Sequence, residues 1–205
     1  MPFVRFGDGP HHFHVAVEYP SGEEASFIIE TFPLSDMPHT IHYFLQTVVH
    51  KLWDNTIFLH TNDHVMQGAP VDKTGQDLRD RFRDAHLAHL AFPEYNPKYN
   101  HEKYTLGFGG RPGGPDFYIS TQDNSHFHGP GGQGQHDIHE EADPCFAKVI
   151  AGFNVIDKMH QITLDAIEAN GGNRITEDKD VRVTVIKSIE LVSTDQKLSS
   201  FHQTM

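Results

Sequence analysis

Two pairs of histidines stand out among the residues of this sequence that could do chemistry. His60 and His64 lie four residues apart, and His126 and His128 lie two residues apart. Imidazole is the commonest metal-ligating side chain and titrates near neutral pH. Two histidines spaced i, i+2 on an extended segment point to one side and can both reach one ion. The pairs therefore raise the hypothesis of a site for a divalent metal such as Cu(II) or Zn(II).

Other candidate groups are less informative. Cys145 is the only cysteine, so neither an intrachain disulfide nor a thiolate metal cluster can form. Because Pro144 and Phe146 flank it, we interpret it as a buried, idle thiol. A further pair, His12 and His14, falls on the polar face of an alternating segment, where a solvated surface is the simpler interpretation and metal ligation the alternative.

A glycine-rich stretch separates two β-prone segments between residues 104 and 129. Tyr104–Phe108 and Asp116–Ser120 are apolar and extended in character, and five glycines lie between residue 107 and residue 114. Such a loop bends tightly or lies close to a ligand. No Lys-Ser or Lys-Thr follows it, so it is not a phosphate-binding loop.

Composition narrows the partners. The 205 residues carry a formal net charge of -12, which argues against nucleic acid because phosphate contacts need a basic surface. No apolar run approaches the ~20 residues that span a bilayer, and the first residues lack the apolar segment of a signal peptide. We expect a monomer without membrane insertion, with one domain over residues 1–192 and a polar tail over 193–205.

Periodicity predicts the main elements. Alternation of Phe13, Val15, Val17 and Tyr19 indicates a strand, and residues 25–32 return as the second strand of a hairpin. A helix follows, with Ser35 or Asp36 as its cap and Pro38 in its first turn. Its core-facing stripe consists of Ile41, Phe44, Leu45, Val48, Val49 and Leu52.

The second half of the chain repeats these signals. Residues 57–60 and 64–67 read as two strands joined by a short loop. Val155, Ile156, Met159 and Ile162 form the apolar stripe of a second helix. Residues 181–185, with Ile189 and Leu191, indicate a closing strand with a bulge where the alternation slips. The arginines at 79, 81 and 83 alternate with acidic residues and look solvated.

Four stretches, in order, resemble the cyclophilin family. Residues 37–44 (MPHTIHYF) are similar to its Pro-x-Thr-x-x-Asn-Phe helix start, and residues 65–68 (VMQG) to its Met-x-Gln-Gly strand. Residues 106–121 resemble its glycine-rich turn followed by Gln-Phe-Phe-Ile. Residues 146–157 (FAKVIAGFNVID) resemble its Phe-Gly-Lys-Val motif. The resemblance implies a mainly β fold: a closed antiparallel β-barrel of cyclophilin type with two capping α-helices.

The catalytic arginine of that family has no clear counterpart. Cyclophilins place it in a Phe-His-Arg sequence, where it donates a hydrogen bond toward the prolyl nitrogen. Without a gap, Leu59 falls at the arginine position and His64 at an aromatic pocket position. With a one-residue deletion, His60 replaces the arginine. Both alignments remain open, and His60 is the candidate catalytic residue.

The remaining pocket positions carry over one by one. The resemblance implies peptide-binding roles for Gln67, Asp116, Phe117, Tyr118 and Phe127. Asp116 stands in place of a glutamine and Tyr118 in place of a phenylalanine, while His126 falls at the pocket tryptophan. Residues 129–144 are an insertion by family standards, either a mobile polar loop or a lid.

Three functions follow as hypotheses. The first is binding of a proline-containing peptide or protein client, with weak or absent peptidyl-prolyl cis-trans isomerase activity. The second is a divalent metal, copper or zinc, held in the same groove by His60, His64, His126 and His128. The third is a binding module without turnover.

Overall fold

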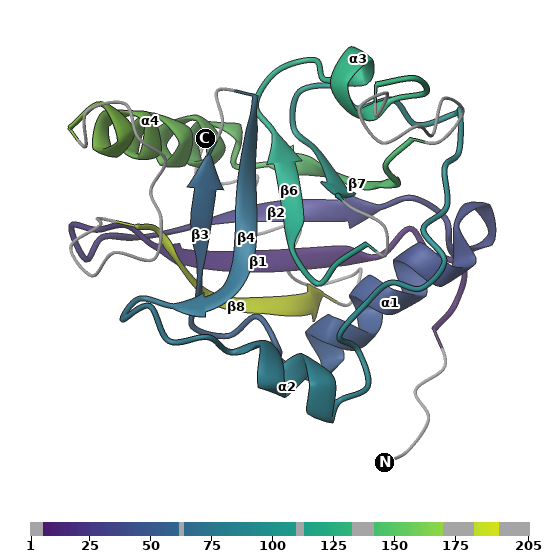
Figure 1. Cartoon of the computed structure of the whole chain (residues 1–205), viewed down its shortest axis with the longest axis horizontal. Helices are drawn as coiled ribbons and strands as arrows, with labels where there is room; N and C mark the ends of the chain where they lie inside the picture. Colours follow the sequence, from purple (N-terminus) through teal and green to yellow (C-terminus); the bar gives the residue numbers. More distant parts are fainter. Residues whose placement is uncertain (1–5, 62–63, 110–112, 133–141, 170–182, 193–205) are drawn as a thin grey trace.

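In the computed structural model the chain folds into a closed barrel of antiparallel strands (Figure 1). The structure describes residues 6–61, 64–109, 113–132, 142–169 and 183–192. Around the barrel the strands follow in the order β1-β2-β7-β5-β6-β4-β3-β8. The prediction of a mainly β fold with a closed antiparallel barrel is confirmed. The predicted tail, residues 193–205, lies outside the described residues, as does most of the predicted loop or lid, residues 133–141.

The strands are short and follow the predicted segments. Their bounds are β1 (His12–Glu18), β2 (Glu24–Thr31), β3 (Thr56–Thr61), β4 (Val65–Asp72), β5 (Thr105–Phe108), β6 (Phe117–Ser120), β7 (Cys145–Ala151) and β8 (Val185–Val192).

The first hairpin forms as the alternation predicted. β1 pairs with β2 in register from His12 opposite Glu30 to Glu18 opposite Glu24. Alternate residues of β1 face the core, and His12 on the other face lies 2.8 Å from a carboxylate oxygen of Glu30. This contact gives His12 a carboxylate partner on the neighbouring strand, and its side chain is only 11% exposed.

The closing strand begins later than the sequence indicated. β8 starts at Val185, and residues 181–182 lie outside the described part of the chain. The predicted bulge is present, because Ala16 pairs with Ser188 and the next residue, Val17, pairs with Ile186. Lys187 is the extra residue, and its ammonium bonds Glu18 at 3.0 Å.

Helix α1 (Pro38–Val49) begins at the predicted proline but is capped differently. Met37 is the N-cap residue and gives no side-chain cap, so the prediction of Ser35 or Asp36 was wrong. Both belong to a 3-10 helix (Leu34–Asp36), and the Asp36 carboxylate bonds Lys98 instead.

A distant carboxylate takes over the capping role. The Thr40 backbone N–H donates to Glu94 Oε2 at 2.8 Å, and the Glu94 N–H donates to the Thr40 hydroxyl at 3.2 Å. These reciprocal bonds resemble a capping box, in which two orphan donors are satisfied at once, but here the partners are 54 residues apart.

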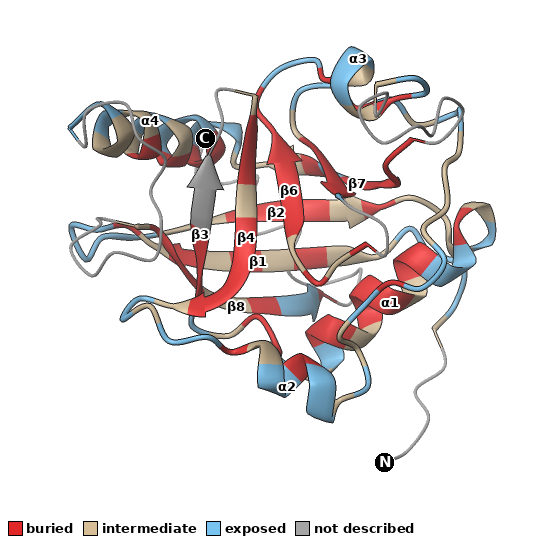
Figure 2. Ribbon diagram, viewed as in Figure 1, coloured by how far each residue is buried: buried red, intermediate tan, exposed pale blue. Residues whose placement is uncertain are grey.

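The predicted stripe of α1 packs into the barrel except at one position. Ile41, Phe44, Leu45 and Val48 are buried, and so is Leu52 just beyond the helix end, whereas Val49 is 40% exposed. Figure 2 shows the buried face of α1 turned toward the strands. Phe44 lies at the centre of an aromatic core formed with Phe13, Phe108, Phe117 and Phe146.

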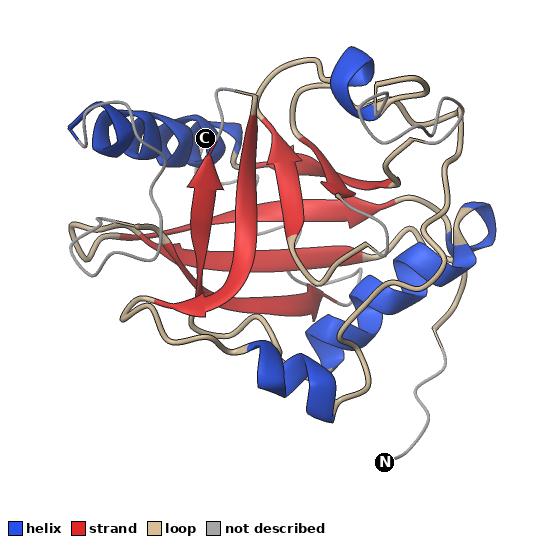
Figure 3. Cartoon of the chain, viewed as in Figure 1, coloured by secondary structure: helices blue, strands red, loops and turns tan. Residues whose placement is uncertain are grey.

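A second long helix, α4 (Phe153–Ala169), lies on the opposite side of the barrel from α1 (Figure 1). Of its predicted stripe, Val155, Ile156 and Met159 are buried and Ile162 is half-buried. Two short helices, α2 (Arg79–Asp84) and α3 (Ser125–His128), were not predicted (Figure 3). Among the described residues no helix has the length and apolarity needed to cross a membrane.

Candidate functional site

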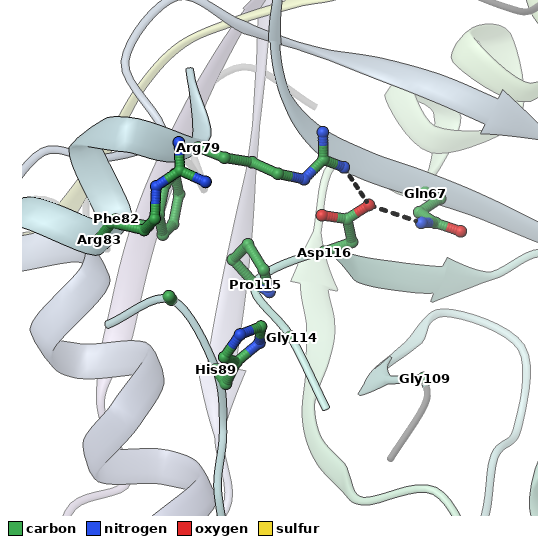
Figure 4. Close-up of a pocket in the computed structure, with 10 residues that line it drawn as sticks. Gln67, Arg79, Phe82, Arg83, His89, Gly109, Gly114, Pro115 and Asp116 are labelled. Carbon is green, nitrogen blue, oxygen red and sulfur yellow. Dashed lines mark hydrogen bonds and ion pairs between the residues drawn. The ribbon is translucent and has the colours of Figure 1, made fainter. Parts of the chain in front are cut away.

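A cavity of about 310 Å³ opens where β4, α2 and the segment before β6 come together (Figure 4). Three polar side chains on its wall come from these separate elements: Gln67 from β4, Arg79 from α2 and Asp116 from the residue before β6. We call this cavity the Gln67 pocket. It brings together two of the predicted peptide-binding residues, Gln67 and Asp116.

The carboxylate of Asp116 joins the other two groups. Gln67 Nε2 donates to Asp116 Oδ2 at 2.9 Å, and an Arg79 guanidinium nitrogen lies 3.4 Å from the same oxygen. Figure 4 shows the amide and the guanidinium approaching this carboxylate from opposite sides. Arg79 was predicted to be solvated, and this part of the interpretation was wrong. Its side chain is only 38% exposed and belongs to the pocket wall.

Two glycines of the predicted loop are needed where they stand. Gly114, on the pocket wall, has a positive φ of 66°, and a Cβ there would lie 2.9 Å from the Tyr43 hydroxyl. A Cβ on Gly107 would lie 2.4 Å from the Tyr118 hydroxyl. The glycines therefore let the backbone pass close to two tyrosines rather than to a phosphate.

A second polar cluster forms around Tyr118, which is paired opposite Gln67 across β4 and β6. His101 Nε2 is 3.0 Å from the Asp143 backbone oxygen, and its Nδ1 is 3.2 Å from the Tyr118 hydroxyl. His128 Nδ1 is 2.8 Å from Asp143 Oδ2. Each of these four residues is at least largely buried, so their hydrogen bonds matter energetically.

The acceptors fix the proton positions. A backbone carbonyl only accepts, so His101 carries its proton on Nε2 and accepts from Tyr118 at Nδ1. Burial lowers the pKa of His101 to about 4, against a smaller opposing effect of the bond to Asp143. His128 likewise donates from Nδ1 to the Asp143 carboxylate, and its buried Nε2 has no hydrogen-bond partner in the part of the chain described.

The structure brings His64 and His128 together but not His126. The rings of His64 and His128 are 5.6 Å apart, and Phe127 lies 4.6 Å from His64. Residues 125–128 form the helix α3 rather than an extended segment, so the premise that His126 and His128 share one side was wrong. His126 is exposed and its ring packs on Phe127.

Of two other predicted residues, one is buried and the side chain of the other lies outside the described part of the chain. Phe117 is 2% exposed and packs against Phe44, Trp53 and Phe58, so it supports the site from beneath. The side chain of His60 lies outside the described residues. Its backbone is registered opposite Gln67 across β3 and β4.

No group of three or more His, Cys, Asp or Glu side chains placed to hold a metal occurs among the described residues. Cys145 is buried, as predicted, and burial raises the pKa of its thiol to about 12. At neutral pH it is therefore protonated and unreactive.

Sequence reasoning missed Arg79, His101 and Asp143. Asp143 precedes a Pro-Cys-Phe strand start, and a lone acid before a buried strand is a weak signal for a buried acceptor. His101 gave no signal, because its partners Tyr118 and Asp143 are distant in the sequence.

Comparison with known proteins agrees with the barrel fold. The sequence model of the family described as "Cyclophilin type peptidyl-prolyl cis-trans isomerase/CLD" matches residues 21–190. A solved cyclophilin-type peptidyl-prolyl cis-trans isomerase from Cryptosporidium parvum is similar over 90% of this chain and 98% of its own, with 16% identity and a TM-score of 0.59.

A second structure of a cyclophilin-type isomerase from that organism was solved in the presence of the dipeptide Ala-Pro. It covers 89% of this chain and 99% of its own, again at 16% identity, with a TM-score of 0.55. At this identity the structural likeness shows the fold alone. No curated protein matches the chain.

Proposed function

Because this chain belongs to the cyclophilin-type peptidyl-prolyl cis-trans isomerase family, as its four motifs predicted, we propose that it binds proline-containing peptides beside Gln67. The isomerase activity that accompanies binding is weak or absent. The bound segment belongs to a peptide or a protein client, and the chain acts as a monomer.

The observation that carries this proposal is the arrangement of Gln67, Asp116 and Arg79 around an open pocket. Peptide sites combine an apolar surface with a few fixed polar groups that orient the backbone. Phe127, 41% exposed, offers apolar surface next to His64. Gln67 lies three residues after His64, a separation of at most about 10 Å along the chain. A short peptide can therefore contact both Phe127 and Gln67.

The weakness of turnover is inferred from β3. Rotation about a prolyl peptide bond has a barrier of ~20 kcal/mol, and a donor that bonds the twisted nitrogen lowers it. The sequence of β3 is TIFLHT and has no arginine. A histidine at position 60 donates as a cation only when protonated, unlike arginine, which is always charged.

We expect the chain to accelerate cis-trans exchange of a short Ala-Pro peptide far less than an arginine-bearing member of the family does. NMR exchange spectroscopy measures the rate directly, and a line-shape titration in the same samples measures binding. If His60 is the donor, turnover should fall as pH rises through the histidine range. A rate equal to that of an ordinary family member would contradict weak turnover, and absence of peptide binding would contradict the function itself.

A second candidate function is binding of a divalent metal such as copper or zinc, with His64 and His128 at its centre. The observation that favours it is His128, whose Nδ1 bonds Asp143 while Nε2 has no hydrogen-bond partner in the described residues. Metal-bound histidines usually donate their other ring nitrogen to such a carboxylate. His60 would be the third ligand, and exposed His126 contributes least.

Titration of Zn(II) and Cu(II) into protein purified without an affinity tag tests this second function. We expect one site in the wild type, strong loss of affinity in His64→Ala/His128→Ala, and little change in the control His126→Ala. Affinity should decline below about pH 6, because protonated imidazoles cannot ligate. Equal affinity in the double variant and the wild type would place the metal elsewhere.

A further inference from the structure

Arg79 is positioned unlike the other arginines of α2. Its guanidinium lies on the wall of the Gln67 pocket, 3.4 Å from Asp116 Oδ2 and 3.5 Å from Asp77 Oδ1. Both distances exceed those of a strong charge-assisted hydrogen bond, about 2.7–2.9 Å. The guanidinium is therefore oriented by two carboxylates but bonded strongly to neither. Most of its five N–H donors remain available to a ligand.

The neighbouring arginines do not share this position. Arg81 donates to the Asp54 backbone oxygen at 3.1 Å and is not part of the pocket wall. Arg83 does line the pocket, but its side chain is 63% exposed and pairs with Asp80 within the same helix. Arg79 alone on this helix is linked through a shared carboxylate to Gln67.

The chemistry of the proposed ligand makes such a donor useful. Twisting a prolyl peptide bond breaks its resonance and returns a lone pair to the nitrogen. A cationic donor aimed at that lone pair stabilises the twisted form more than the planar one. Gln67 is less suited, because one of its two amide protons already bonds Asp116.

We propose that Arg79, which is positioned by α2 and by its contact with Asp116, donates a hydrogen bond to the nitrogen of the amide bond that precedes a bound proline. This inference rests on the proposed peptide-binding function. It assigns to a residue outside the barrel the donor that β3 lacks. The carboxylate of Asp116 also offsets part of the guanidinium charge, which is consistent with weak turnover.

The test compares Arg79→Gln and Arg79→Lys with the matched control Arg81→Gln in exchange spectroscopy on the Ala-Pro peptide. We expect Arg79→Gln to lower the exchange rate, or the peptide affinity where exchange is undetectable, by about ten- to a hundredfold, the usual loss for one charge-assisted bond. Arg79→Lys keeps the charge but loses the planar guanidinium. Its exchange rate or peptide affinity should therefore lie between those of the wild type and Arg79→Gln. Arg81→Gln should match the wild type.

The possible outcomes distinguish the role of Arg79 from the peptide-binding function on which it rests. If wild-type protein binds the peptide and Arg79→Gln is within twofold of it in both affinity and exchange, the role of Arg79 is overturned and the peptide-binding function stands. If wild-type protein neither binds nor isomerises the peptide, both are overturned. Unchanged thermal unfolding of Arg79→Gln excludes a folding defect, which the 38% exposure of this side chain also argues against.

Discussion

Replacing Phe44 with alanine should lower the free energy of unfolding by about 3–5 kcal/mol, the range found when a buried aromatic side chain is truncated. Phe44 has no exposed surface. Its ring lies 4.9–6.5 Å from four others, which come from β1, β5, β6 and β7. The cavity left by the substitution is bordered by strands of a closed barrel, which cannot move inward independently to fill it.

Urea unfolding followed by tryptophan fluorescence measures this loss, because Trp53 packs on Phe117, a neighbour of Phe44. Val49→Ala is the matched control, since it removes an apolar side chain from the same helix at a 40% exposed position. It should cost well under 1 kcal/mol. A loss in Phe44→Ala as small as in the control would show that α1 does not hold the barrel core together.

The substitution should also disturb the candidate site. Phe117 stacks edge-on against Phe44 and is directly preceded by Asp116 and followed by Tyr118. These two residues face the two polar clusters. Loosening the ring beneath them should weaken peptide binding even in molecules that remain folded, because polar groups orient a ligand only when their backbone is held in place.

The fold could be predicted because its signals are local or repeated. Alternation in β1 and the three-and-four spacing in α1 each report a buried face within a dozen residues. The four motifs then predicted a closed antiparallel barrel of cyclophilin type, which the structure has. Local reasoning failed at the start of α1, where the cap is Glu94 rather than a neighbouring Ser or Asp.

The candidate site could be predicted only where its residues lie inside those motifs. Gln67 and Asp116 come from recognisable strands and do meet. Arg79 reaches Asp116 across 37 residues of sequence, and His101 reaches Asp143 across 42. Such contacts depend on where the loops place these residues relative to the barrel, and neither periodicity nor charge spacing predicts that placement. The four-residue helix α3 was missed for a related reason, because long-range bonds such as that between His128 and Asp143, rather than its length, hold it in place.

The stability of the folded chain should depend on pH through His101. Its pKa is lowered to about 4 in the folded state, mainly by burial, from an ordinary value of 6.5. The groups that face it are Tyr118, Asp143 and His128. Between these two pH values the unfolded chain holds a proton on His101 that the folded chain does not hold.

The sign of the effect follows from this difference. Wherever the unfolded state binds more protons, the free energy of unfolding rises with pH. The contribution of His101 is therefore complete above about pH 6.5 and is lost as the pH falls toward 4. A difference of about two and a half pKa units corresponds to about 3 kcal/mol, at 1.36 kcal/mol per unit.

Urea unfolding at a series of pH values between 4 and 7.5 measures this slope. His101→Gln keeps a hydrogen-bonding side chain but cannot titrate in this range, so its stability curve should be flatter than that of the wild type. Its absolute stability will be lower, since glutamine does not reproduce both bonds of the imidazole, and only the slopes are compared.

His126→Gln removes an exposed histidine and is the control for losing one imidazole. Equal slopes in His101→Gln and the wild type would show that His101 does not resist protonation in the fold. An NMR titration of its ring protons would then place its pKa close to 6.5.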